Sequence, residues 1–325
     1  MNTTNVDSSN YDLLDQEAKY NRERDYLYTA IPGIDNAKEP QIVEAKDMTE
    51  VIFKKEWVNN NHTCLIKGAI NHWPAMKNWR DKEYWLKTSN RKEVTLYRNN
   101  GHELDEKYLK GHLRINFHEA INRLYDNVDY AVYLPANIPE AFKDIAGFHF
   151  LPSPPKPNNY EPITLLIQRR TFTTWHAHPY DEFLLSQVMG SKKVILFPPN
   201  IPEDKNYVCD FLRDELYLEG KSLNKKLNYN PIIAELKEGD ALYIPPYWHH
   251  AVHTLGAGIN FSVIYRWGSP LHKMGNFNSR FVIDNYKDLL WPVNKYTPIV
   301  PLIAGSCFTS YIFKRMTGQI SGQYI

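Results

Sequence analysis

The sequence predicts a mainly β protein, a β-sandwich or jelly roll with helices at both ends. Three observations lead to this prediction. Between residues 94 and 266, short runs rich in β-branched and aromatic residues alternate with turn-forming segments, and few helical patterns separate them. The 21 prolines outnumber the 15 glycines and cluster in turn-like runs such as residues 152–157. Hydrophobic residues make up 43% of the chain and aromatic residues 14%, so the chain can bury a large core.

The predicted elements divide the chain into three parts. A polar arm covers residues 1–40, and a helical region covers residues 269–325. Between them, a single barrel over residues 41–268 begins with a helix at 47–60 and a strand at 63–68. Its further strands are predicted at residues 94–97, 130–134, 163–174, 183–187, 193–197, 232–235, 241–244 and 260–266.

The C-terminal part contains one segment that resembles a membrane anchor. Residues 297–313 carry no charge and are flanked by Lys295 and Lys314. The segment is shorter than the roughly 20 residues of a spanning helix, and it contains Pro298 and Pro301. A buried or dimer-forming helix is therefore the favoured interpretation, with a homodimer through the C-terminal helices.

Composition excludes several classes of partner. The 38 Lys and Arg residues balance 37 Asp and Glu residues, so the formal net charge is +1 and the chain lacks the field that nucleic acid or a membrane surface requires. We expect a peptide or small-molecule substrate instead. Cys64, Cys209 and Cys307 show no metal-type spacing and cannot all pair. With a polar, acidic start that has no apolar signal segment, this predicts a cytoplasmic protein.

Histidines are concentrated in two places. His176 and His178 form one pair, and His249 and His250 form another about 70 residues later. Residues two apart on a strand share a face, so His176 and His178 converge, and Glu182 has the same parity if the extended geometry continues. One imidazole of the second pair would complete a set of three nitrogens. Such a set suits Fe, Zn, Cu or Ni and leaves positions open for substrate or oxygen.

Three sequence blocks, in this order, resemble the cupin-like (JmjC-type) non-haem iron, 2-oxoglutarate-dependent oxygenases. They are LIKGAINHWPA at residues 65–75, QVMGSKKVILFPP at 187–199 and GDALYIPPYWHH at 239–250. The resemblance extends from about Val51 to Trp267, and it is strongest to protein asparaginyl and peptide hydroxylases. It implies a double-stranded β-helix that binds Fe(II) and uses 2-oxoglutarate and O₂ to hydroxylate a peptide side chain or a small amino-acid-like substrate.

The resemblance also assigns the metal ligands. His176 matches the first ligand of the family and His250 the last. His249 stands where the family usually has a second tryptophan, so we interpret it as a wall residue of the pocket. His178 stands where the family has an aspartate, and iron would then be held by three neutral imidazoles. Such a site should still bind a dianionic chelate.

Further matches concern the cosubstrate. Lys192 matches the lysine that grips the distal carboxylate of 2-oxoglutarate, and Thr173 matches a hydroxyl that often assists. Tyr130 or Tyr133 is the candidate for the phenol near the same carboxylate. Physical chemistry favours this role for Lys192. Burying a lysine ammonium inside a barrel costs free energy unless an anion pairs with it.

Two departures leave alternatives open. The spacing of His176, His178, Glu182 and His250 also resembles the general cupins, whose metal is held by three histidines and one glutamate. Glu182 is therefore either a fourth ligand that restores the lost charge, or a rim carboxylate in a salt bridge. Ile264 stands where the oxygenase family usually has an asparagine near the cofactor, and Asn260 or Ser262 is the candidate to compensate.

Three hypotheses follow. The first is the iron and 2-oxoglutarate oxygenase described above. The second is a three-histidine, or three-histidine and one-glutamate, cupin metalloenzyme that does not use 2-oxoglutarate. The third is a non-catalytic binding module that keeps the fold. The substrate stays unidentified, because selectivity in such folds lies in loops, here residues 142–160 and 204–230.

Overall fold

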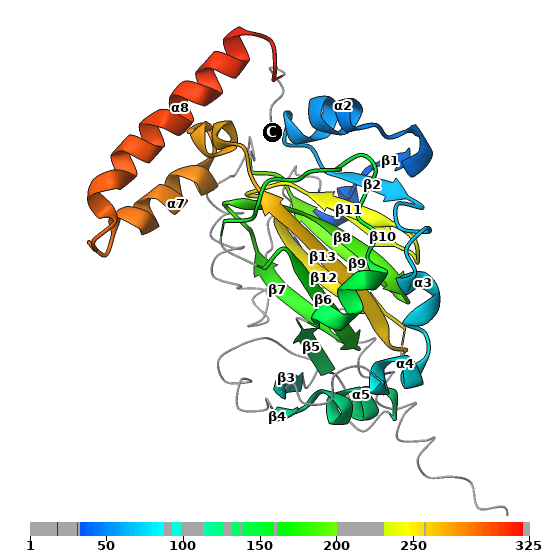
Figure 1. Ribbon diagram of the computed structural model, residues 1–325. Helices are drawn as coiled ribbons and strands as arrows, with labels where there is room; N and C mark the ends of the chain where they lie inside the picture. Colours follow the sequence, from blue (N-terminus) through cyan, green and yellow to red (C-terminus); the bar gives the residue numbers. More distant parts are fainter. Residues whose placement is uncertain are drawn as a thin grey trace, which may run out of the picture.

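The computed structural model shows a two-sheet jelly roll that carries a helical hairpin at its C-terminal end (Figure 1). It describes residues 18, 31, 33–87, 93–98, 113–126, 132–136, 138–158, 161–199, 231–256 and 258–320. The predicted mainly β jelly-roll fold is confirmed.

The larger sheet has nine strands among the described residues, in the order β1-β2-β11-β8-β13-β6-β5-β3-β4. Its strands pair antiparallel, except for β1 and β2, which pair parallel. The strands are β1 (Gln41–Glu44), β2 (Cys64–Lys67), β3 (Glu93–Arg98), β4 (Leu113–Asn116), β5 (Val132–Ala136), β6 (Ile163–Arg169), β8 (Asp181–Met189), β11 (Ala241–Ile244) and β13 (Asn260–Gly268).

The smaller sheet has four described strands in the order β10-β9-β12-β7, all antiparallel. They are β7 (Phe172–His176), β9 (Ser191–Phe197), β10 (Ile232–Leu236) and β12 (His249–Leu255). The single strand predicted over residues 163–174 is two strands, because the backbone turns at Arg170, which has a φ of 48°. This turn carries the chain from the large sheet to the small one.

Side-chain alternation explains how the large sheet serves two cores. On β8, Phe183 and Leu185 face the small sheet and pack with Leu196 and Val252 inside the barrel. Their neighbour Leu184 faces the opposite way, into a second and larger core under the N-terminal helices. Because strand side chains alternate with a period of two, every residue of β8 belongs to one core or the other.

Short helices cover the outer face of the large sheet. The predicted helix at 47–60 is observed as α2 (Glu50–Ile52), which continues as a π-helical segment, η3 (Phe53–Val58). The side chain of Thr49 caps α2 by accepting a hydrogen bond from the Ile52 backbone nitrogen at 3.2 Å. The other helical segments here are η1 (Ile34–Asn36), η2 (Ala45–Asp47), α3 (Ala75–Asn78), α4 (Lys82–Leu86), α5 (Phe117–Tyr125) and η5 (Pro139–Asp144).

The C-terminal part forms η7 (Leu271–Gly275), α7 (Arg280–Leu290), η8 (Thr297–Ile299) and α8 (Val300–Met316). Its helices pack against the end of the barrel through a cluster that includes Tyr247, Tyr286 and Cys307. Among the described helices, none is long and apolar enough to cross a membrane.

Candidate metal centre

The three predicted histidines meet at one end of the barrel. His176 ends β7 and lies directly opposite His250 of β12, and His178 follows in the loop before β8. One ring nitrogen from each histidine lies within 4.8 Å of the other two. The ring centroids of His176 and His250 are 4.2 Å apart, and those of His176 and His178 are 5.2 Å apart. The predicted convergence of His176 and His178 is thus observed, although His178 lies just beyond the end of the strand.

Electrostatics keep His178 and His250 in the neutral form that binds metal. Burial, together with the neighbouring His176 and Arg266, lowers the pKa of His178 to about 3. Burial also lowers the pKa of His250 well below its usual value. The Nδ1 of His250 lies 2.9 Å from the Trp248 carbonyl oxygen, so this nitrogen donates and Nε2 is left as the ligand atom. Three neutral imidazoles fit a divalent transition metal such as Fe(II) or Zn(II).

The loops that carry the histidines are tied together. Between β11 and β12 the chain turns at Tyr247, which has a φ of 65°. The Tyr247 backbone nitrogen donates to the His178 carbonyl oxygen at 3.1 Å, and the Trp248 indole donates to the Asn61 carbonyl oxygen at 2.8 Å. This turn separates β11 from β12, so His250 lies near the start of its own strand.

Glu182 does not join the histidines. Its carboxylate forms a fully buried ion pair with Lys273 at 2.6 Å and accepts a hydrogen bond from the Tyr243 hydroxyl at 2.6 Å. The expectation that extended geometry continues from His178 to Glu182 is wrong, because the chain bends at Pro179 and β8 begins only at Asp181. Glu182 consequently faces the outer core, and the interpretation as a salt-bridged carboxylate holds, although inside the protein rather than at a rim.

His249 also departs from the expectation. It precedes His250 on β12 and so faces the other side of the small sheet. There its ring packs on Phe281 of α7, with the ring centroids 3.9 Å apart. His249 therefore contacts the C-terminal helices and is not a wall residue of the barrel interior.

Lys192 lies at the other end of the barrel interior. Its side chain is fully buried and donates a hydrogen bond to the Gln168 amide oxygen. Burial lowers the pKa of Lys192 to about 7. Lys192 shares its strand face with Leu196, which pairs with His250, so four residues of β9, or about 13 Å, separate the lysine from the histidines. Apolar side chains of both sheets fill the interval.

Buried polar side chains surround the lysine. Asn260 lies opposite Gln168 on the neighbouring strand and accepts a hydrogen bond from Gln187 at 3.0 Å. Ser262 donates to the Gln187 amide oxygen at 2.8 Å. Asn260 and Ser262, the two candidates to compensate for Ile264, therefore both lie in this network.

The remaining predicted residues are placed as follows. Tyr133 pairs with Gln168 in the strand register, next to the lysine end, and Tyr130 lies outside the described residues. The Thr173 hydroxyl accepts a hydrogen bond from the Val252 backbone nitrogen at 3.1 Å, beside a bulge in β12. Ile264 packs against the apolar core between the two polar ends.

Three interior residues were missed by sequence reasoning: Gln168, Gln187 and Arg266. Arg266 lies opposite Phe183, whose ring centroid is 5.1 Å from that of His178. Its guanidinium donates to the Thr164 hydroxyl at 2.8 Å and contributes to lowering the pKa of His178. Strand parity counted from Ser262 predicts that Arg266 faces inward, and that signal was available in the sequence.

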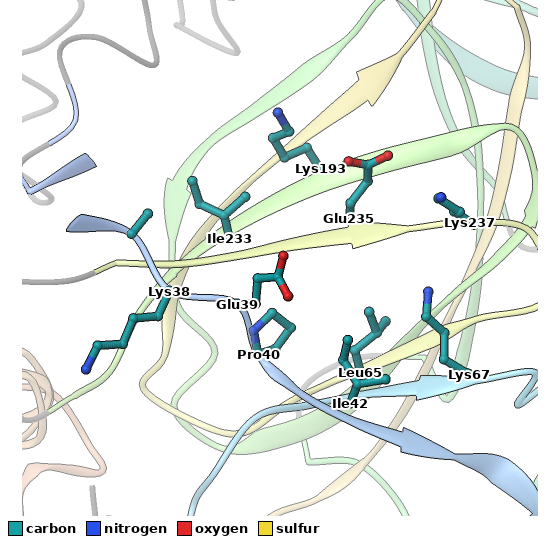
Figure 2. A pocket seen from close by; sticks show the side chains of 11 residues that line it. Lys38, Glu39, Pro40, Ile42, Leu65, Lys67, Lys193, Ile233, Glu235 and Lys237 are labelled. Atoms are coloured by element: carbon teal, nitrogen blue, oxygen red, sulfur yellow. The ribbon is translucent and has the colours of Figure 1, made fainter. Parts of the chain in front are cut away.

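A separate groove of about 410 Å³ opens on the outer surface (Figure 2). It lies between the edge strands β1 and β10, and its charged residues include Lys193 and Glu235. None of the histidines contributes to it, and Lys193 is the neighbour of Lys192 on the opposite face of β9. The groove is thus separate from the candidate metal centre.

Comparison with known proteins finds a cupin-like domain and relatives that include JmjC-domain proteins. Residues 50–272 match the model of the cupin-like domain. The chain is similar to Jumonji C domain-containing protein 5 of Drosophila melanogaster, with 26% identity over 71% of this chain and 60% of that protein. It is also similar to JmjC domain-containing protein D of Dictyostelium discoideum, with 24% identity over 61% of this chain and 50% of that protein. For tRNA wybutosine-synthesizing protein 5 of Danio rerio, the identity is 28% over 41% of each chain. The chain thus spans less than two thirds of each of these relatives.

Proposed function

The chain belongs to the cupin-like domain family, and from this premise we propose that it is an Fe(II)- and 2-oxoglutarate-dependent oxygenase that hydroxylates an unactivated carbon. His176, His178 and His250 would hold the iron, and Lys192 would bind the distal carboxylate of 2-oxoglutarate. When bound, iron with 2-oxoglutarate supplies the oxidative chemistry. The protein would contribute the metal ligands and the cation that binds the distal carboxylate.

One observation carries the proposal: the two ends of the barrel interior are chemically complementary to a metal-chelating dicarboxylate. One end offers three neutral imidazole ligands, and the other offers a fully buried lysine. Removing an ammonium group from water costs free energy. The Gln168 amide supplies a hydrogen bond to Lys192 but no negative charge. A carboxylate delivered by the cosubstrate would supply that charge.

The direct test is anaerobic reconstitution of the apoprotein with Fe(II), followed by 2-oxoglutarate. We expect a visible charge-transfer band when the chelate forms, and succinate when air is admitted. Tight iron binding without the band would contradict the proposal in favour of a metalloenzyme that does not use 2-oxoglutarate. Absence of metal binding would favour a non-catalytic binding module.

The lowered pKa of Lys192 predicts proton uptake on binding. Burial holds this pKa at about 7, so at pH 8 the side chain is mostly neutral before the ligand arrives. A bound carboxylate favours the charged form, and the complex therefore takes up as much as about one proton. We expect the affinity of the metal-loaded protein for 2-oxoglutarate to rise as the pH falls from 9 to 7 and to level off below 7. Calorimetry in buffers of different ionisation enthalpy measures the uptake, and an affinity independent of pH from 7 to 9 would contradict it.

A second candidate function is a three-histidine metalloenzyme that does not need 2-oxoglutarate. The observation that favours it is His178, which adds an imidazole where the related oxygenases have a carboxylate, while the nearby Glu182 is engaged with Lys273. The predicted fourth ligand is thus not part of this candidate, and the metal would keep its full double charge.

The substrate is proposed to be a peptide side chain or a small amino-acid-like molecule. Arg266 supports this, because its guanidinium lies inside the barrel beside the histidine cluster, where it suits a carboxylate or a peptide carbonyl. One relative is named for tRNA wybutosine synthesis. The balanced charge of this chain, +1 overall, does not favour nucleic acid as its own substrate.

A further inference from the structure

The outer groove lies between the last strand of each sheet (Figure 2). Among the described strands, β10 ends the small sheet and β1 ends the large one. The chain crosses from the edge of β10 to β1 through Lys38, Glu39 and Pro40, and these residues lie at one end of the groove. One wall of the groove is therefore a strand edge, which presents backbone donors and acceptors.

The chain itself fills the first position on this edge. The Lys38 backbone nitrogen donates to the Pro231 carbonyl oxygen at 2.8 Å, and the Lys38 carbonyl oxygen accepts from the Ile233 nitrogen at 2.8 Å. These two bonds pair Lys38 parallel with Ile232. The next donor to the Ile233 carbonyl oxygen would be Pro40, but a proline has no N–H. The pairing therefore stops after one bridge, and the chain continues into β1.

Beyond this bridge, β10 keeps backbone groups that can pair with a further strand. The backbone groups of a strand alternate between its two edges, so Ala234 pairs with β9 while Ile233 and Glu235 face the groove. Among the described residues, no strand pairs with the Ile233 carbonyl or with the N–H and C=O of Glu235. The open edge ends at Lys237, whose nitrogen donates to the Asp240 carboxylate at 3.1 Å. From Ile233 to Lys237 this edge is about 13 Å long.

The floor of the groove offers an apolar contact beside this edge. Ile42 pairs with Leu65 in the register of β1 and β2, so both side chains point to the same face of the large sheet. Leu65 belongs to the barrel core, whereas Ile42 is 53% exposed. A strand added beside β10 would lie over Ile42 and turn every second side chain toward it.

Cations outnumber carboxylates around the groove. Its charged lining residues are Lys38, Lys67, Lys193, Lys237, Glu39 and Glu235. Figure 2 shows Lys67 and Lys237 at the same end of the groove, away from Lys38. Asp240 lies at that end and forms an ion pair with Lys67 at 2.7 Å. Two ammonium groups thus meet one carboxylate there, which favours an acidic side chain of a ligand over a basic one.

We propose that the outer groove binds an extended segment of a partner protein, which adds to the small sheet as a strand beside β10. The segment would run parallel to β10, as Lys38 does. Its backbone would donate to the Ile233 carbonyl oxygen and accept from the Glu235 N–H. Every second side chain would be apolar and pack on Ile42, and an acidic side chain would follow beside Lys237. A small anion would contact the lysines but neither the strand edge nor Ile42, so a peptide fits the groove better.

The inference does not depend on the proposed oxygenase activity. Among the described residues, the groove is lined neither by the histidines nor by Lys192. Lys192 and Lys193 are neighbours on β9 and point to opposite faces of the small sheet. Changes in the groove should therefore leave metal binding unchanged, and metal affinity reports whether each variant is folded.

A labelled peptide tests the proposal on the full-length chain by fluorescence anisotropy. The probe is a fluorescein-labelled, amidated peptide in which valine alternates with threonine and glutamate replaces the last threonine. We expect saturable binding, and weaker binding when lysine replaces the glutamate. Two further probes carry N-methyl groups on all valines or on all threonines. The valines that face Ile42 also direct their N–H groups to β10, so methylated valines should weaken binding about tenfold or more, and methylated threonines should not.

Variants of the protein test the same contacts from the other side. Glu235→Pro removes the N–H that faces the groove, at an edge position where proline is tolerated, and we expect binding about tenfold weaker or more. Glu235→Ala keeps this N–H and is the matched control. Ile42→Asp should weaken binding because it removes the apolar contact. Val51→Asp is its control, since Val51 is 72% exposed on α2 and does not line the groove.

Several results would overturn the proposal. One is the absence of saturable binding at millimolar peptide. Another is equal binding of the two methylated probes, because a strand edge distinguishes them. If inorganic phosphate also displaced the probe in that case, the groove would be a site for small anions. A light-scattering mass of two chains that Ile42→Asp reduced to one would place a second copy of this chain in the groove instead of a partner segment.

Discussion

Replacement of Lys192 by methionine is expected to weaken 2-oxoglutarate binding at least a hundredfold, on the order of 3 kcal/mol, while metal affinity stays unchanged. Lys192 is the fully buried cation at the end of the barrel interior opposite the histidines. Without it, the distal carboxylate of the ligand would be buried with only neutral partners such as the Gln168 amide. Calorimetric titration of the metal-loaded variant with 2-oxoglutarate measures the loss.

Stability separates this loss of affinity from misfolding. Methionine has a similar length and no charge to desolvate, so Lys192→Met should unfold in urea at the same concentration as the wild type or at a higher one. Lys193→Met is the matched control, because the adjacent side chain lies on the other face of β9 and borders the outer groove. The control should bind 2-oxoglutarate normally. If Lys192→Met binds within threefold of the wild type, Lys192 does not hold the carboxylate.

Sequence reasoning predicted the convergent part of the site because parity along a strand is a local rule. His176 and His178 lie only two residues apart, at and just after the end of β7. Lys192 was assigned by the resemblance to the oxygenase family, and it lies within the continuous strand β9. The jelly roll itself followed from the regular alternation of strands and turns. These features depend on short stretches of chain, in which the spacing of residues determines the face of the strand to which each side chain points.

The errors arose wherever the backbone left the extended geometry. Glu182 lies four residues after His178, and the intervening bend reverses the face that parity assigns to it. The turn at Tyr247 likewise starts a new strand before His250, so His249 faces α7. A positive φ at a tyrosine is unusual and no residue pattern in the sequence announces it. The partner of Glu182, Lys273, lies 91 residues away, in a segment that was interpreted only as the start of a helical region.

Replacement of His178 is expected to lower the metal affinity of the protein strongly. His178→Ala removes one of three converging imidazoles, and we expect Fe(II) or Zn(II) affinity to fall at least a hundredfold, because even changes next to metal ligands cost tens of fold. His178→Asp should keep the metal, since it supplies a charged oxygen ligand. The added negative charge should weaken the binding of dianionic 2-oxoglutarate several-fold. Competition with a chromogenic chelator measures the metal affinity of each variant.

The control for these variants is a change at Glu182, whose carboxylate points away from the histidines because the chain bends at Pro179. In the double variant Glu182→Gln with Lys273→Met, both charges of the buried pair are removed together, which avoids leaving Lys273 unpaired in the core. Metal affinity should stay at the wild-type value, because Glu182 faces the outer core with Tyr243. If His178→Ala instead retained metal within threefold and the double variant lost it, the fourth-ligand arrangement of the general cupins would hold. The charge of this metal centre therefore depends on whether residue 178 or residue 182 faces the barrel interior, and the bend at Pro179 places His178 there.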